Sequence, residues 1–212
     1  MEMKTESEEL SDGVWIEEID NAALKQFEKH QKAFQRGFVN IMPYKTIFPK
    51  SFLSFEKRIR DFEVRDDDVY VVSFPKCGTT WTQEMVWNIC NGCDVEKAKS
   101  LPLVKRMPFI EISGLLKDNL VAGMSEEAKK AMPEAADSVN NASNMPRNEP
   151  RLLKTHVSYD MLPEQVREKK PKIVYVTRNP RDAVVSFYNH WKALCGFTGR
   201  VRRCLNKFGL YT

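Results

Sequence analysis

The sequence predicts an α/β fold in which a parallel sheet is flanked by helices. Three short apolar stretches, residues 69–74, 151–155 and 172–177, have the length and composition of buried strands. Helical patterns follow the first and the third stretch directly, and strands that alternate with helices are typical of parallel sheets. The chain of 212 residues is long enough for one sizeable domain with its own core.

Two features are expected ahead of the first strand. Residues 20–38 place four apolar side chains at mostly helical spacing, which predicts a helix packed against the domain. These side chains are Leu24, Phe27, Phe34 and Phe38. The run Asp66-Asp67-Asp68 predicts a polar turn that leads into the strand.

The hydrophobic period changes after the first strand. Trp81, Met85 and Ile89 stand four residues apart, so they mark one face of a helix that ends near residues 91–92. The stretch 71–85, VVSFPKCGTTWTQEM, is therefore predicted to be a strand, a tight loop and a helix.

Local signals predict the later elements. Residues 133–150 are rich in Pro, Asn, Ser and Ala and predict a surface loop, whereas Ser125 predicts the cap of a short helix before it. Asn179 followed by Pro180 predicts the start of another helix. Its apolar face is expected to consist of Val184, Tyr188 and Trp191.

Charge and composition narrow the classes of function. The formal net charge is +4, which is too small to favour a dedicated nucleic-acid-binding protein. Residues 196–212 hold basic residues and no acid, which predicts a basic, divergent tail after a domain of residues 1–195. No apolar run reaches the ~18 residues of a membrane span, and the acidic start lacks the features of a signal peptide.

Cysteine usage bears on location and on metals. The chain has five cysteines, and this odd number favours reduced thiols and a cytoplasmic location over a disulfide framework. Cys90 and Cys93 supply only two thiols, too few for a zinc site, so no metal is expected.

Three polar clusters follow the three predicted strands, and parallel sheets bind ligands at the carboxyl ends of their strands. The first cluster is Lys76, Cys77, Gly78, Thr79 and Thr80. Gly78 allows the backbone to approach an anion, and the helix after it offers free N–H groups and a positive dipole end. Lys76 adds charge, the threonines add hydroxyl donors, and Trp81 offers a face for stacking. These residues predict a phosphate-binding loop, although a capped helix with a core tryptophan explains them equally well in isolation.

This loop differs from the GxxxxGK[ST] loop of nucleotide triphosphatases, because its lysine precedes its only glycine. That difference weakens the alternative of a small-molecule kinase. The second cluster, RLLKTH, places Lys154 and His156 on the same side of a strand by alternation. In the third, RNPRDAVVSFY, Arg178 directly precedes a helix and Ser186 lies two turns into it. An arginine at such a place suits a phosphate.

Taken in order, FPKCGTTW, RLLKTH and RNPRDAVVSFY closely resemble the cytosolic sulfotransferase family, over roughly residues 40–194. The resemblance implies the sulfotransferase fold, which is P-loop-like. It also implies transfer of a sulfuryl group from 3′-phosphoadenosine 5′-phosphosulfate (PAPS) to a hydroxyl of a small molecule, without a metal. The acceptor that the resemblance implies is a phenol, a steroid or another alcohol, and neither nucleic acid nor membrane is an expected partner.

The resemblance implies a nucleotide site. Residues 76–81 match the family's loop for the 5′-phosphosulfate, and Trp81 matches the residue that stacks on the adenine. Arg178 and Ser186 match the pair that binds the 3′-phosphate.

The resemblance also implies a catalytic and acceptor site. His156 matches the base that takes the proton of the acceptor hydroxyl, in an in-line displacement at sulfur. Lys154 matches a lysine that holds the transferring sulfuryl group, and Lys76 is expected to stabilise the leaving phosphate. Phe109 matches an aromatic wall of the acceptor pocket, which Lys154 and His156 also line.

The chain departs from the family after Leu194. The family continues with further helices, a glycine-containing segment over the 3′-phosphate and a dimer segment, and no such motif follows here. We therefore expect a domain that is incomplete at its C-terminus, a monomer, weaker nucleotide binding and an exposed Trp191. Two functions remain open: a sulfotransferase, or a truncated, catalytically impaired isoform that acts as a non-enzymatic or regulatory fragment.

Overall fold

A computed structural model of the chain describes residues 7–11, 13–19, 22–34, 36–116, 126, 130 and 133–199. The chain divides into two compact units: Ser54–Arg178, and Met1–Leu53 together with Asn179–Thr212. The predicted cap at Ser125 and the basic residues after position 199 lie outside the described residues, so both stay predictions.

The unit Ser54–Arg178 is built on a three-stranded parallel sheet. Strand β5 (Val69–Ser73) lies in the centre, between β6 (Leu152–Thr155) and β7 (Lys172–Val176). Both pairings are parallel, and Val71 stands opposite Lys154 on one side and Val174 on the other. All five residues of β5 are buried, as expected for a central strand whose two faces are covered. The three strands predicted from sequence and their parallel arrangement are thereby confirmed.

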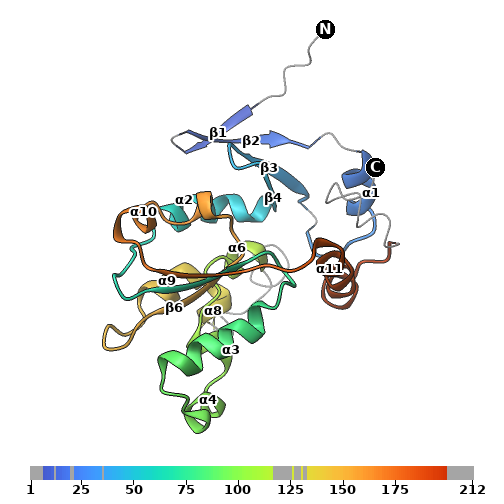
Figure 1. Cartoon of the computed structure of the whole chain (residues 1–212). Helices are drawn as coiled ribbons and strands as arrows, with labels where there is room; N and C mark the ends of the chain where they lie inside the picture. The colour runs from blue at the N-terminus through green and yellow to red at the C-terminus, as the bar shows by residue number, and fades with distance from the viewer. Residues whose placement is uncertain are drawn as a thin grey trace. The chain divides into compact units, whose positions relative to one another are not determined.

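Short helices flank this sheet. They are α2 (Leu53–Arg60), α3 (Thr79–Cys90), α4 (Val95–Ser100), α5 (Leu103–Arg106), α6 (Ile112–Leu116), α8 (Pro133–Ala136), α9 (Ser138–Ser143) and α10 (Gln165–Lys169), with a 3₁₀ turn, η3 (Tyr159–Met161). Figure 1 shows α3, α8 and α9 on one side of the sheet and α2 and α10 on the other. The core under α3 joins Val71 and Leu152 of the sheet to Trp87 and Met107.

Helix α3 has the predicted bounds but buries a different face. Trp81, Met85 and Ile89 lie on α3 as predicted, but they are not its buried face, because Trp81 is 75% exposed and Ile89 is 73% exposed. The buried side of α3 is formed by Thr79, Thr82, Gln83 and Trp87. Spacing of four residues identifies a stripe on a helix, but it does not decide which stripe meets the sheet.

The predicted surface loop over residues 133–150 is wrong in its first half. Residues 133–143 form α8 and α9, and Ser138, Val139 and Ala142 of α9 are buried. The side chain of Asp137 caps α9 by accepting the N–H of Asn140 at 3.1 Å. A cap of this kind offsets the weak helix propensity of the asparagines and serines that follow.

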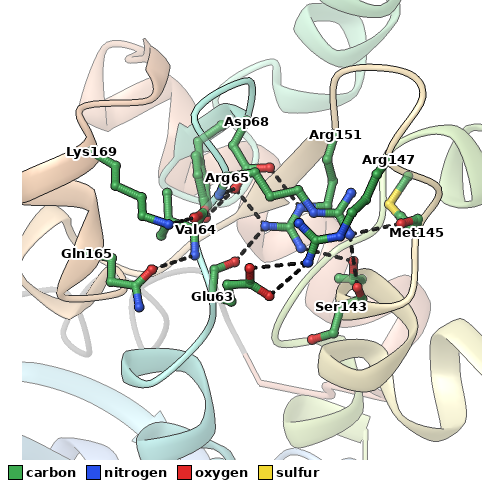
Figure 2. Close-up of polar contacts among 12 residues, drawn as sticks. Glu63, Val64, Arg65, Asp68, Ser143, Met145, Arg147, Arg151, Gln165 and Lys169 are labelled. Carbon is green, nitrogen blue, oxygen red and sulfur yellow. Dashed lines mark hydrogen bonds and ion pairs between the residues drawn. The ribbon is translucent and has the colours of Figure 1, made fainter.

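The predicted polar turn ahead of β5 contains a buried ion pair. Asp68 is fully buried and accepts two hydrogen bonds from Arg151, both of 2.7 Å (Figure 2). Arg65 donates to the backbone oxygens of Ser143 and Met145, at 3.0 and 2.8 Å. The network holds the segment after α9 against the amino ends of β5 and β6, at the edge of the sheet opposite to their carboxyl ends.

The second unit contains a four-stranded antiparallel sheet that the sequence patterns did not predict. Its strands, in order, are β1 (Ser7–Ser11), β2 (Val14–Glu18), β3 (Phe38–Met42) and β4 (Thr46–Pro49), drawn in blue in Figure 1. A 3₁₀ turn, η1 (Lys50–Phe52), follows β4. The predicted helix over residues 20–38 is wrong beyond α1 (Ala22–Glu28), because Phe38 begins β3.

Aromatic residues from both ends of the chain form the core of this unit. Helix α11 (Pro180–Leu194) begins where predicted, and the Asn179 side chain accepts the N–H of Arg181 at 3.0 Å. Trp191 is 5% exposed, so its predicted exposure is wrong. Its ring lies 4.9 Å from that of Phe27, which also stacks on Phe197 at 4.9 Å. Phe34 and Phe38 pack on the same cluster, although they are not helical.

Candidate active site

The polar clusters that follow β5, β6 and β7 lie at one edge of the parallel sheet. Parallel strands end at the same edge, so the loop after Ser73, the pair Lys154 and His156, and Arg178 become neighbours. Two contacts demonstrate this proximity. His156 hydrogen-bonds to Ser73, and the Arg178 guanidinium donates to the backbone oxygen of Lys76 at 3.2 Å.

The loop between β5 and α3 has an unusual backbone. Lys76 has φ = 68° and Gly78 has φ = 100°. The left-handed region is costly for a residue with a Cβ, which explains glycine at position 78 and indicates local strain at Lys76. Helix α3 starts directly after Gly78, and no side chain caps its N-terminus within the described residues. The first N–H groups of α3 and the positive end of its dipole therefore face the loop.

The two threonines of the loop differ in their surroundings. Thr79 is buried, and its hydroxyl lies 2.5 Å from the Ser73 hydroxyl, so it ties α3 to the end of β5. Thr80 and Trp81 are exposed. Cys77 is buried, and burial raises the pKa of its thiol, which argues against a reactive thiolate.

The imidazole of His156 has a defined orientation. Its Nδ1 lies 2.7 Å from the backbone oxygen of Ser73. A carbonyl oxygen only accepts, so Nδ1 carries the hydrogen and the neutral ring keeps its lone pair on Nε2. That tautomer places the basic nitrogen on the side of the ring away from β5.

Residues 108–110 run alongside β6, which the sequence did not predict. Lys154 donates its N–H to Pro108 at 2.8 Å and accepts the N–H of Ile110 at 3.0 Å. Phe109 stands opposite Lys154 in this bridge. The Phe109 ring lies 4.1 Å from Lys154 Nζ and 4.9 Å from the His156 ring. Both side chains touch one ring, so Lys154 and His156 do share one side of the strand.

The site concentrates positive charge. Burial lowers the pKa of Lys154, the carboxyl of Glu111 opposes this effect, and the charge on Lys76 lowers the pKa further. Two ammonium groups that repel each other at the edge of a sheet form an arrangement that an anion stabilises.

Sequence patterns missed one residue of this site. Glu111 is fully buried and accepts the backbone N–H of His156. An acid within the apolar stretch 107–112 was the available signal. The role of this acid becomes clear only when the hydrogen-bond partner of its carboxyl is known.

Two predicted site residues, Arg178 and Ser186, have fewer described contacts with the rest of the site. Arg178 is exposed and reaches the loop as described. Ser186 is half-buried in α11, which belongs to the other unit, so its grouping with Arg178 stays a prediction. Among the described residues there is no cluster of three His, Cys, Asp or Glu side chains suited to a metal.

Comparisons with known proteins identify a family. The profile of the Sulfotransferase domain family matches residues 66–199, more than half of the chain. Luciferin sulfotransferase of Photinus pyralis is 40% identical over 167 residues, which is 77% of this chain and 44% of that protein. Sulfotransferase 1E1 of Homo sapiens is 32% identical over 176 residues, 83% of this chain and 50% of that protein.

Solved structures support the fold. A retinol dehydratase in complex with androsterone and the inactive cofactor PAP superposes with a TM-score of 0.77 and 24% identity. The superposition covers 94% of this chain and 62% of that one. The chain spans about half the length of the curated relatives it matches. With the profile match over residues 66–199, these findings show that the chain belongs to the sulfotransferase domain family.

Proposed function

We propose that this chain transfers a sulfuryl group from PAPS to a hydroxyl of a small molecule, with His156 as the general base. One observation carries the assignment of the base: the Nδ1–H of His156 is held by the Ser73 oxygen at 2.7 Å, beside Lys154 and Phe109. In this tautomer the lone pair lies on Nε2, which is the nitrogen that takes the proton in general-base catalysis.

The residues of the loop suit the nucleotide. The helix N-terminus after Gly78 and the ammonium group of Lys76 match a phosphate. The exposed ring of Trp81 offers a face on which an adenine stacks, and Arg178 at the same edge offers a guanidinium for a second phosphate. When bound, the nucleotide supplies the activated sulfuryl group.

In the proposed step, the acceptor oxygen attacks sulfur while His156 Nε2 takes its proton. The bond between sulfur and the phosphate oxygen breaks, and its electrons stay on that oxygen. Lys76 and the N–H groups of α3 stabilise the charge that develops there. Lys154 stabilises the transferring group. The products are a sulfate ester and 3′-phosphoadenosine 5′-phosphate (PAP), so atoms and charge balance without a metal.

The acceptor is proposed only as a class. Phe109 lines the site next to His156, and an aromatic wall favours an apolar alcohol such as a phenol or a steroid. One relative is named for luciferin, and one solved structure is a complex of a retinol dehydratase with androsterone; both are properties of those proteins. The alternative of a fragment without catalysis is not favoured by any contact described above.

Location and assembly stay predictions. None of the helices among the described residues is long and apolar enough to cross a membrane. A cytoplasmic location is what the cysteine content and the resemblance predict.

The test is PAPS-dependent sulfation of a simple phenol by the full chain. Replacing the base, His156→Ala, is expected to lower kcat by ~10² to 10⁴. His30→Ala serves as the control, because His30 contacts Thr198 in the other unit. Both variants should keep the stabilisation by PAP, ~2.7 kcal/mol at 100 times its Kd. Equal rates for wild type and His156→Ala, or no stabilisation by millimolar PAP, contradict the proposal.

A further inference from the structure

A buried carboxyl lies directly behind the candidate base. Glu111 is 0% exposed, and its Oε1 accepts the backbone N–H of His156. Burying a carboxyl costs free energy, which its contacts must offset. Besides the His156 N–H, the side chain of Thr155 favours the ionised form of this carboxyl.

The segment that carries Glu111 is held from three sides. Residues 108–110 pair with β6 through Lys154. From α9, Ser138 Oγ donates to the backbone oxygen of Ile110 at 2.5 Å. From α3, Glu84 accepts two hydrogen bonds from Arg106, at 2.9 and 2.8 Å. These anchors keep the Glu111 carboxyl against His156.

Glu111 also acts on the cations of the site. Burial raises the pKa of its carboxyl to about 7, although the His156 N–H and the charge on Lys154 favour the ionised form. The charge on Glu111 raises the pKa of Lys154, and the charge on Lys76 of the loop lowers it. The carboxyl therefore changes its charge in the pH range in which an imidazole titrates.

We propose that Glu111 is a positioning residue that holds the His156 backbone, and hence its imidazole, and balances the charge on Lys154. The effect of Glu111 on catalysis rests on the proposed sulfuryl transfer, whereas its effect on the position of His156 does not. The Nδ1–H bond to Ser73 and the backbone N–H bond to Glu111 hold His156 from the two neighbouring segments, β5 and residues 108–111. A base held at both points keeps Nε2 in one orientation.

Two variants of Glu111 separate its hydrogen bond to His156 from its charge. Glu111→Gln keeps an oxygen for the His156 N–H and removes the charge, whereas Glu111→Met removes both at similar volume. Glu56→Gln is the matched control, because Glu56 is a buried glutamate that pairs with Arg60 in α2. The readouts are nitrogen-15 NMR titration of the His156 ring without substrate, and the pH profile of kcat.

Glu111→Gln is expected to keep the Nδ1–H tautomer and to move the alkaline limb of kcat to lower pH. The reason is that Lys154 loses the carboxylate that opposes the lowering of its pKa by burial. Glu111→Met is expected to lose the single tautomer and up to ~10² in kcat, with an unchanged KM for PAPS. Glu56→Gln should change neither readout.

The inference is overturned if both variants keep the wild-type tautomer, ring titration and pH profile and differ only in melting temperature. Should Glu111→Met fail to fold, Glu111→Gln decides alone through the alkaline limb and the ring titration. An inactive wild type would refute sulfuryl transfer, and the NMR titration would still decide the positioning role. The two failures are therefore distinguishable.

Discussion

At the scale of single residues, the site depends on atoms whose state is set by their partners. His156 is a base candidate because the Ser73 oxygen takes its Nδ1–H, and not because it is a histidine after a strand. His30 has the same side chain and contacts a threonine hydroxyl instead. Glu111 likewise differs from the exposed acids of the chain through burial and through its bond to His156.

The buried carboxyl predicts a pH-dependent stability. Its pKa rises from 4.5 to about 7 on folding, so the folded state binds the proton more tightly than the unfolded state. The contribution of this proton binding to the free energy of unfolding is therefore complete at pH values below the unfolded-state pKa. It is lost as the pH rises through the folded-state pKa. Relative to Glu111→Gln, the wild-type free energy of unfolding should fall by about 3 kcal/mol between pH 4.5 and 7. Urea denaturation across this range measures it, and parallel curves for the two proteins contradict it.

The proposed phosphate-binding role of the loop predicts different outcomes for alanine substitutions at two glycines. Gly78 and Gly92 have φ of 100° and 65°, and a Cβ at either position would meet no atom within 4 Å. Alanine should therefore cost about 1–2 kcal/mol at each position through backbone strain alone. Only Gly78→Ala should also lose the thermal stabilisation by PAP. If Gly92→Ala loses it too, the loop has no special part in binding.

At the scale of elements, local signals predicted bounds better than orientation. The start of α11 at Pro180 and the end of α3 at Cys90 follow from Asn179 and from Asn91-Gly92, whose effects are local. The buried face of α3 was not predictable in this way, because Trp87 is one apolar residue among several on the helix. Its burial depends on the sheet and on Arg106, whose guanidinium lies 4.6 Å from the Trp87 ring.

The contact between α9 and residues 110–113 gives a prediction at this scale. The Ser138 hydroxyl donates to Ile110 at 2.5 Å and accepts the N–H of Ser113 at 3.3 Å, both in a buried environment. Ser138→Ala should lower the free energy of unfolding by ~1–3 kcal/mol, because the Ile110 oxygen loses a partner. Ser143→Ala is the control, because Ser143 is an exposed residue of the same helix whose hydroxyl bonds only to the Val139 oxygen one turn earlier, and it should change stability little. Equal effects in denaturation experiments would refute a special role for Ser138.

At the scale of the whole molecule, the two units depend on contacts that are distant in sequence. In one unit, Arg151 and Asp68 join strands that are 83 residues apart (Figure 2). In the other, Phe27 near the N-terminus packs against Trp191 and Phe197 near the C-terminus. Phe197 thus contributes to a core, even though sequence reasoning assigned it to a divergent tail.

Phe197 therefore predicts a large effect from a position near the end of the chain. Phe197→Ala should lower the free energy of unfolding of its unit by ~3–5 kcal/mol, the cost of removing a buried aromatic ring. Leu194→Ala is the control, because Leu194 is 72% exposed on α11. Thermal and urea unfolding compare the two variants. A small effect of Phe197→Ala would contradict the described packing.

The sequence by itself determined the parallel sheet, the strand–loop–helix around Gly78 and the neighbourhood of Lys76, Lys154, His156 and Arg178. These follow from short-range signals and from one topological rule, that parallel strands end at the same edge. Tertiary structure alone decided the pairing of residues 108–110 with β6, the tautomer of His156 and the burial of Glu111 behind it. Each of these depends on groups 45 or 83 residues apart that meet only after folding. The periodicity of apolar residues along the sequence does not identify such distant partners.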